Sequence, residues 1–335
     1  MPGHRSTTFG RVVMVPCPDP MQIASDAPAT FRSSADRPGA LELLATAARE
    51  VSSRRRLIRY LVRAEIKKKG TDTVLGNVWW VLDPLFSLLV YVFVMSVVFG
   101  RGQPEFGVFL LAAMIPFKWF TGTLSDSVTA VVSQGQLIKQ IQFPKIVLPI
   151  VSNGAGLVNL GVGMLVLFAI VLIVPEYRPH LTIMVLFVPV IAAIQAVLML
   201  AFSMFLSAFT VFYRDIGIIM GHLLRLLFYV APILWSFEAE SGRGKQIHDV
   251  VGPVGFSILR DNPVAILLES YRKAIYGVPY QQAVPGGEPI AAWRPATFGD
   301  MDLVALGLVL AASVLLLVVG TITFKRLEPA FAKVL

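Results

Sequence analysis

The sequence predicts an all-α integral membrane protein with six transmembrane helices, an N-terminal amphipathic helix at the membrane interface and short extracytoplasmic helices. Three observations favour this fold class. The 335 residues are 56% hydrophobic and only 15% charged, which lies far from the composition of ordinary globular domains. Six apolar runs are long enough to cross a bilayer core of ~30 Å as helices. Basic residues gather beside those runs, as they do on the cytoplasmic side of membrane proteins.

The six runs define the predicted domain organisation. We expect spans at residues 81–99, 106–132, 146–174, 181–213, 216–235 and 303–324. They form one transmembrane domain over residues 79–335, which includes a long extracytoplasmic segment at 236–301. Residues 41–78 hold the interface helix. Residues 1–40 are rich in Pro, Ser, Asp and Arg without apolar periodicity, so we expect a disordered cytoplasmic arm.

The position of the basic residues predicts the orientation. Eight basic residues and one acid lie between Arg54 and Lys69, and Arg214 and Lys325 follow the fourth and sixth runs. Both termini are therefore expected in the cytoplasm. Because the excess charge of +8 crowds beside spans, it indicates contact with anionic lipid and not with nucleic acid. The single cysteine, Cys17, excludes an intrachain disulfide framework and a cysteine metal cluster.

The stretch "SSRRRLIRYLVRAEIKKKG" has the pattern of a helix lying in the membrane interface. Its basic face recurs at steps of three and four and consists of Arg56, Arg59, Arg63 and Lys67. Two interpretations are open and compatible. The helix meets anionic headgroups or a charged lipid substrate, or it is a simple positive-inside anchor.

The extracytoplasmic segment contains a second amphipathic helix, in "NPVAILLESYRKAIYG". Asn262 can cap it, Pro263 fits its first position and Gly277 can end it. Glu269 can pair with a basic residue three or four positions later, Arg272 or Lys273. Its apolar face holds Val264, Leu267, Leu268, Tyr271 and Ile275. At about thirteen residues it is too short to span, so we expect it at the outer leaflet.

The connection "QLIKQIQFPKIVLPI" between the second and third runs is too apolar for a simple loop. Lys139 and Lys145 flank aliphatic and aromatic residues on a short helix-compatible stretch that Pro144 stops. The apolar residues are Leu137, Ile138, Ile141 and Phe143. Such an amphipathic knob is typical of a device that docks in a cleft of another protein. The alternative is a loop that rests on the membrane.

Together with "LGNVWWVLDPL", "FYRDIGIIMGHLLRLLFYVAPILW" and the extracytoplasmic helix, this connection resembles the permease subunits of ABC-2 type transporters. More narrowly, the chain is similar to bacterial exporters of lipid-linked polysaccharides, such as O-antigen, teichoic acid, capsule and galactan. The resemblance implies that residues 136–145 are a coupling helix that docks on an ATPase subunit, and that Arg214 and Asp215 form a second turn facing it. It also implies that residues 256–277, with Asn262, Pro263, Tyr271 and Arg272, form extracytoplasmic gate helices.

The resemblance further implies the partners and the location. The chain lacks a G-x-x-x-x-G-K-[ST] phosphate loop, so ATP and Mg²⁺ are expected on two copies of a separate ATPase subunit, with no cofactor or metal in this chain. A polymer-sized passage would need a homodimer related by a two-fold axis. The expected location is the bacterial plasma (inner) membrane, where a polyprenyl-diphosphate-linked polysaccharide leaves the cytoplasm.

Several span residues are candidates for the transport path. Charges inside spans are costly, and Lys118 and Arg225 could attract the diphosphate. The alternatives are an ion pair between Asp126 and Arg225, or snorkelling of Lys118. A stripe of phenylalanines on the fourth run could let a glycan slide, or could be ordinary helix packing. It consists of Phe202, Phe205, Phe209 and Phe212.

Two other functions are open. The same fold could export a small drug or lipid, although the two amphipathic helices favour a polysaccharide. A membrane-embedded transferase acting on polyprenyl phosphate would need clustered carboxylates, and the cytoplasmic loops hold only scattered acids. Arginines exceed lysines by nineteen to ten, which is typical of GC-rich genomes and hints at an actinobacterial galactan exporter.

Overall fold

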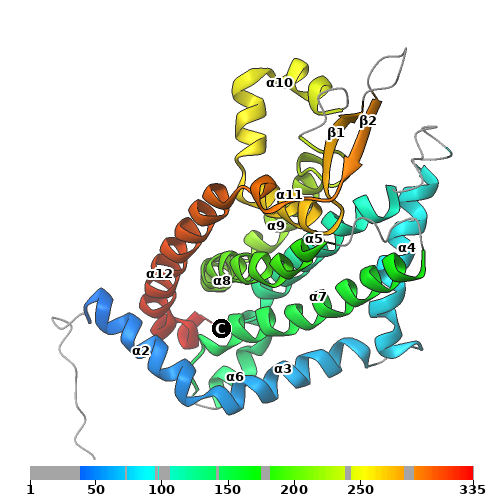
Figure 1. The fold of residues 1–335 in the computed structure, drawn as a ribbon. Helices are drawn as coiled ribbons and strands as arrows, with labels where there is room; N and C mark the ends of the chain where they lie inside the picture. Colours follow the sequence, from blue (N-terminus) through cyan, green and yellow to red (C-terminus); the bar gives the residue numbers. More distant parts are fainter. Residues whose placement is uncertain are drawn as a thin grey trace, which may run out of the picture. The chain divides into compact units, whose positions relative to one another are not determined.

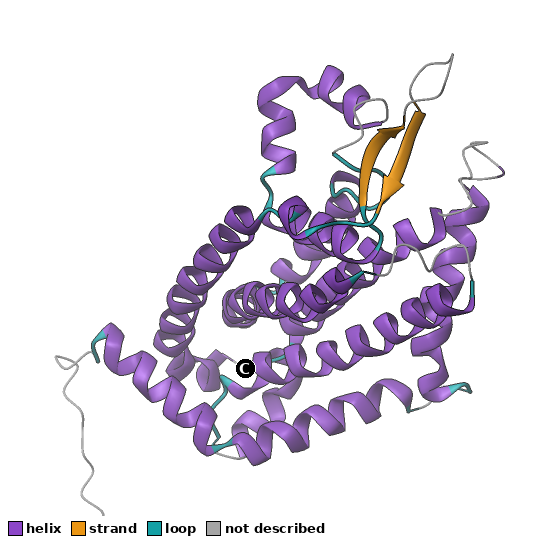
Figure 2. Cartoon of the chain, viewed as in Figure 1, coloured by secondary structure: helices purple, strands orange, loops and turns teal. Residues whose placement is uncertain are grey.

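The computed structural model describes residues 38–71, 74–94, 97, 106–140, 143–174, 182–237, 243–282 and 290–334. The predicted arm, residues 1–40, therefore lies almost entirely outside the described residues. The chain from Ala40 to Leu335 is one compact unit. Its described part consists of helices and one β-hairpin (Figures 1 and 2).

Within the described residues, four helical segments are long and apolar enough to cross a membrane. They are α5 (Phe106–Thr129), α7 (Val147–Ile173), η5 (Ile183–Phe187) with α8 (Val188–Phe212), and α12 (Leu303–Val334). They coincide with the second, third, fourth and sixth predicted runs, which are thereby confirmed as long apolar helices. The first and fifth runs hold the shorter helices α4 (Trp79–Phe93) and α9 (Asp215–Val230), so the count of six spans stays a prediction.

The segment between α9 and α12 contains a bent helix pair. These helices are α10 (Arg243–Arg260) and α11 (Pro263–Ile275). Residues 246–260 and α11 together are apolar enough for a membrane, but they meet at 79°, the geometry of a broken span or a re-entrant loop. The predicted start of α11 is confirmed, because the Asn262 side chain accepts a hydrogen bond from the Val264 backbone N–H, and Pro263 follows it.

An antiparallel hairpin of β1 (Val278–Gln282) and β2 (Ile290–Arg294) follows α11. The all-α prediction missed this hairpin, which is drawn in orange in Figure 2. Its first residue follows Gly277, whose φ of +117° favours glycine. A Cβ at Gly277 would lie 2.2 Å from the Arg294 carbonyl oxygen, so the strand can start here only because a side chain is missing.

Shorter helices lie beside this bundle. They are α2 (Ala40–Ser53), α3 (Arg55–Gly70), α6 (Gly135–Gln140), and the 3₁₀ turns η1 (Gly76–Val78), η3 (Val132–Gln134) and η6 (Phe298–Asp300). Helix α3 lies along α7, and α2 lies against α12 (Figure 1). Below, the end of the bundle that carries α6 is called the α6 end, and the end that carries α11 is called the α11 end.

Helix α5 is the centre of the fold. In its most apolar window 78% of the residues are buried, compared with 22% for α12, because α5 packs against α7, α8 and α11. Gly156 of α7 permits the close approach, since a Cβ there would lie 2.1 Å from Thr123 Oγ1 of α5. A first apolar cluster fills this region, and a second one lies at the α6 end between α2, α6, α8 and α12.

Candidate functional site

The predicted coupling segment is described in part. Helix α6 covers residues 135–140, whereas Ile141 and the side chain of Leu137 lie outside the described residues. Ile138 is buried in the second apolar cluster, and Phe143 is partly buried against it. Ile138 therefore packs on its own chain, and the docking role of the segment stays a prediction. A six-residue helix that lies against its own chain must turn one apolar residue inward, and Ile138 is that residue.

The end of the coupling segment is anchored to α12. The Lys145 backbone N–H donates to Glu328 Oε1 at 2.8 Å, and its ammonium group donates to the Glu328 carbonyl oxygen at 3.4 Å. Pro144 supplies the carbonyl that receives the first backbone hydrogen bond of the turn into α7, from Val147. Of the residues in this segment whose side chains the structure describes, Gln136 and Lys139 are exposed.

The turn between α8 and α9 lies at the same end as α6. Arg214 and Asp215 are both exposed in this turn. A Cβ at Gly217, two residues further on, would meet Val128 near the end of α5 at 3.5 Å, and α5 leads directly into η3 and α6. The structure thus brings the two predicted docking turns to one end of the bundle.

Helix α3 has the two faces that the sequence predicts. Its basic residues are exposed: Arg56, Arg59, Arg63 and Lys67. The opposite face contacts α7, where Val62 lies 2.9 Å from the position of a Cβ at Gly154. The amphipathic helix is confirmed, and the role of its basic face stays a prediction.

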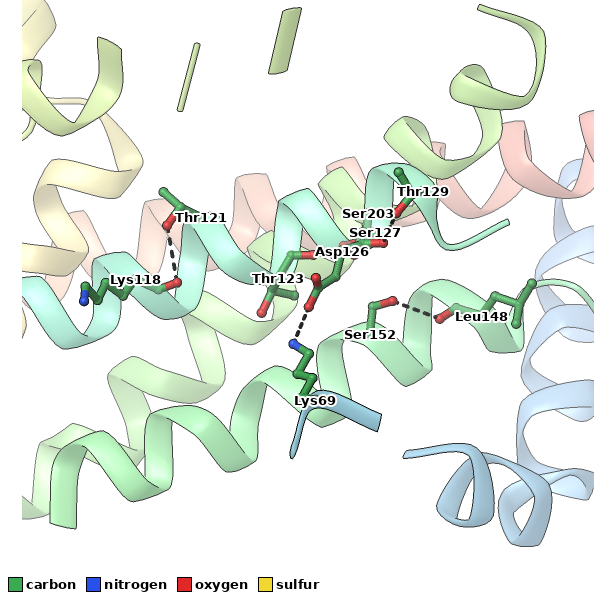
Figure 3. A network of polar contacts seen from close by, with 10 residues as sticks. All are labelled: Lys69, Lys118, Thr121, Thr123, Asp126, Ser127, Thr129, Leu148, Ser152 and Ser203. Carbon is green, nitrogen blue, oxygen red and sulfur yellow. Dashed lines mark hydrogen bonds and ion pairs between the residues drawn. The ribbon is translucent and has the colours of Figure 1, made fainter. Parts of the chain in front are cut away.

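An ion pair fixes the end of α3 to α5. Lys69 Nζ lies 2.5 Å from Asp126 Oδ2, and Figure 3 shows the two side chains directed toward each other. The alternative pairing of Asp126 with Arg225 is therefore wrong, because the end of α3 supplies a nearer cation than α9 does. A cavity of about 330 Å³ lies beside this pair, and its polar lining includes Glu65, Lys68 and Gln134.

Lys118 is paired within the chain. Its ammonium group lies 2.6 Å from Asp83 Oδ2 and 2.5 Å from Ser87 Oγ, both on α4. Sequence reasoning did not single out Asp83, although it stands next to Pro84 inside the first apolar run. The pair joins α4 to α5 and gives the partly exposed Lys118 charge a partner.

Two exposed polar residues, His222 and Arg225, lie within the apolar part of α9. Within the described residues, His222 and Arg225 have no ion-pair partner, and both are exposed. Their neighbours Leu223, Leu226 and Tyr229 are exposed as well. This face therefore combines a charge with apolar surface.

The phenylalanine stripe on α8 divides between two surroundings. The Phe205 ring lies 3.0 Å from the position of a Cβ at Gly320 of α12, and Phe212 contacts Phe331 of α12 at a ring distance of 6.0 Å. Phe209 stacks on Phe205 with its ring nearly parallel, at 6°. Phe202 instead lines an apolar cavity of about 530 Å³ between α5, α8, α9 and the start of α11. Phe205 and Phe212 thus have the ordinary packing role.

The predicted gate helix α11 is held by a buried arginine. Arg272 is 1% exposed and donates hydrogen bonds to three backbone carbonyl oxygens, those of Pro232, Ile233 and Trp235. It also pairs with Glu269 at 2.8 Å, which is the spacing of three that the sequence favours. Its guanidinium group lies 3.9 Å from the centre of the Phe109 ring. Tyr271 beside it is fully buried, so α11 packs on α5 and α8 with its apolar face.

Sequence reasoning missed a polar ladder inside the spans. Asn153 Nδ2 donates to Ser203 Oγ at 2.9 Å, Ser203 Oγ donates to Ser127 Oγ at 2.8 Å, and Ser127 Oγ donates to the Thr123 carbonyl at 2.7 Å. These hydrogen bonds join α7, α8 and α5. The signal was an amide and hydroxyls in otherwise apolar runs. Among the described residues, no group of three or more His, Cys, Asp or Glu could hold a metal ion.

Comparisons with known proteins agree with the motifs. Residues 56–241 match the family model described as ABC-2 type transporter. The chain is 30% identical over 247 residues to the O-antigen export system permease protein RfbA of Myxococcus xanthus, covering 73% of this chain and 88% of the relative. It is 24% identical over 283 residues to the RfbA permease of Klebsiella pneumoniae, covering 83% and 95%. The chain belongs to the ABC-2 type transporter family, and its predicted similarity to O-antigen export permeases is confirmed.

Proposed function

We propose that this chain is the permease subunit of an ATP-binding-cassette exporter that moves a polyprenyl-diphosphate-linked polysaccharide from the cytoplasm across the plasma membrane. The observation that carries the proposal is the meeting of the α6 segment and the α8–α9 turn at one end of a bundle of long apolar helices. The similarity to O-antigen export permeases over most of the chain supports an O-antigen type of glycan.

The ATPase subunit would dock at the α6 end. Lys139 and Arg214 are exposed there on two separate connections, and charges at the rim of an interface steer the partner into register. Ile138 supports this surface from inside and does not enter the partner. Hydrolysis of ATP, with its Mg²⁺, would take place on that subunit, because this chain has no phosphate loop. The basic residues beside the spans support a cytoplasmic position for this end and for both termini.

A second copy of the chain would cover α9. A charged side chain deep in a span does not face lipid tails, but faces protein or a water-filled path. Arg225 lies ten residues into α9, about 15 Å from its start at 1.5 Å per residue. Because Arg225 is exposed on the single chain, the face that it shares with Leu226 and Tyr229 needs a cover. A two-fold pair of α9 helices would place two arginines beside the path of the anionic diphosphate.

Co-purification tests the proposal. The chain is expressed in membranes with the ATPase subunit encoded beside it, and the complex is assayed for its mass and for ATP hydrolysis. We expect two copies of each chain, and we expect Lys139→Glu with Arg214→Glu to lose the ATPase subunit. Lys333→Glu is the control, because it reverses one positive charge on an exposed residue near the end of α12, as each of the two substitutions does. A folded wild-type chain that purifies without any ATPase subunit would refute the proposal.

A further inference from the structure

A cluster of four charged residues joins three distant segments at the α6 end. Lys325 of α12 pairs with Glu50 of α2 and, at 2.7 Å, with Glu328 one turn further along α12. Glu328 in turn accepts the two hydrogen bonds from Lys145 at the end of the coupling segment. The cluster thus joins residues far apart in the chain: Lys325 and Glu50 are separated by 275 positions, and Glu328 and Lys145 by 183.

The cluster is not a group of surface charges. The Lys325 side chain is 6% exposed and that of Glu328 is 14% exposed. A lysine that served only as a positive-inside anchor would extend toward water and headgroups, as the exposed Lys333 does on the same helix. The Lys325 ammonium group pairs with both carboxylates, so removing it takes this partner from Glu50 and from the poorly hydrated Glu328.

Apolar packing joins the same three segments. Phe324 and Phe331, on either side of the cluster on α12, are fully buried and contact each other at a ring distance of 5.3 Å. They belong to the second apolar cluster together with Ala47 of α2 and Ile138 of α6. The coupling segment is therefore attached to α12 twice, by an apolar contact within α6 and by a polar contact after it.

This attachment matters because α6 is too short to hold its own position. A helix of six residues is only marginally stable by itself in water. An ATPase subunit that pushes on α6 can therefore move the spans only through the segments that contact α6. Helix α12, in contrast, packs along α8, where the Phe205 ring lies close over Gly320. A displacement of α6 would reach the spans through α12.

We propose that Glu328 locks the coupling segment to α12 and that Lys325 and Glu50 are the positioning residues that hold its side chain, so that movement of the ATPase subunit is converted into movement of the spans. This inference rests on the proposed function, since it assumes an ATPase docked at α6. It predicts a specific failure when the lock is broken. ATP is still hydrolysed on the partner, but less polysaccharide is exported for it.

The test uses Lys325→Met in the full chain, co-expressed with its ATPase subunit in cells that lack the native permease gene. Polysaccharide on the cell surface is extracted and quantified, and ATP hydrolysis is measured on the purified complex in lipid nanodiscs. We expect the complex to assemble, hydrolysis to stay within about twofold of the wild type, and surface polysaccharide to fall by about tenfold, in the range of typical coupling between sites. Lys333→Met is the control and should change neither readout.

A second variant covers the case in which Lys325→Met does not fold. Glu50→Gln removes one partner from the peripheral helix α2, where the carboxylate is 29% exposed, and leaves the pair of Lys325 with Glu328. It should show the same separation of hydrolysis from export, and the double variant should be no worse than Lys325→Met, because both changes break one unit.

The outcomes separate the two proposals. Wild-type export and wild-type hydrolysis in both variants would overturn the positioning role and leave the proposed function intact. Loss of hydrolysis together with loss of the complex would also overturn it, because the cluster would then serve only assembly. A wild-type chain that binds no ATPase subunit would refute the proposed function itself.

Discussion

Removal of the buried Arg272 guanidinium group should destabilise the permease more than any substitution of an exposed residue in the same segment. Arg272→Met keeps the length and the apolar part of the side chain but deletes the charge. The carboxylate of Glu269, 13% exposed, loses its ion pair with Arg272, and three carbonyl oxygens in the segment that follows α9 lose a donor. Breaking a buried pair by removing one partner costs ~3–5 kcal/mol.

This free energy converts into a measurable melting temperature. Since 1 kcal/mol shifts the melting temperature by roughly 2–4 °C in chains of 150–250 residues, a loss of ~3–5 kcal/mol predicts a fall of roughly 6–20 °C. The assay is the loss of the monodisperse chromatographic peak of the detergent-purified chain after heating. The melting temperature of Arg272→Lys should lie between those of the wild type and Arg272→Met, because one ammonium group cannot reach all of the acceptors that the guanidinium group reaches.

The matched control for Arg272 is Arg260→Met. Arg260 ends α10, its side chain is 62% exposed, and its partner is the neighbouring Asp261, so the control should change the melting temperature by at most a few degrees, as exposed pairs are worth ~0–1 kcal/mol. If Arg272→Met melts within the range of the control, the buried network does not hold α11 to the end of α9, and the reasoning is refuted.

Two further changes test the packing and the electrostatics. Gly156→Ala should lower the melting temperature, because its Cβ would lie 2.1 Å from Thr123 Oγ1 and overpacking costs ~1–3 kcal/mol. The control is Gly161→Ala on the same helix, whose Cβ would meet nothing within 4 Å and which should leave the melting temperature unchanged. Equal melting temperatures of the two variants would contradict this packing. The hydrogen bonds from Arg294 hold the pKa of Asp300 well below its ordinary value, so the Asp300 carboxylate stabilises the fold above pH ~4 and stops doing so as the pH falls through its lowered pKa. Asp300→Asn should therefore melt below the wild type at pH 7 and approach it as the pH falls below ~4, and a difference independent of pH would exclude an ionic cause.

The elements that the sequence predicted well are those with local signals. Asn262, Pro263 and Gly277 mark the two ends of α11 by their own backbone preferences, and the structure confirms both ends. The long spans follow from apolar length alone. The basic face of α3 follows from residues three and four positions apart. None of these features depends on a distant part of the chain.

The features that the sequence could not give depend on pairing between distant segments. Asp126 pairs with Lys69, which lies 57 positions away in the chain, and not with Arg225. The periodicity of the sequence does not show which of the two cations lies nearer. The same holds for the inward turn of Ile138, because a six-residue helix has apolar residues on more than one side. The hairpin was missed for a related reason, since β1 exists only by pairing with β2 beyond a further stretch of chain.

The length of α12 explains how Lys325 and Glu328 can lie on a membrane-spanning helix without being buried in the hydrocarbon core. Its 32 residues extend ~48 Å at 1.5 Å per residue, compared with a hydrocarbon core of ~30 Å. The last turns, which carry Lys325 and Glu328, therefore project beyond the span that begins at Leu303. There the pairs with Glu50 and Lys145 form in a buried but protein-lined place. At its other end α12 contacts α11, so one continuous helix contacts both the coupling segment and the helix that Arg272 holds.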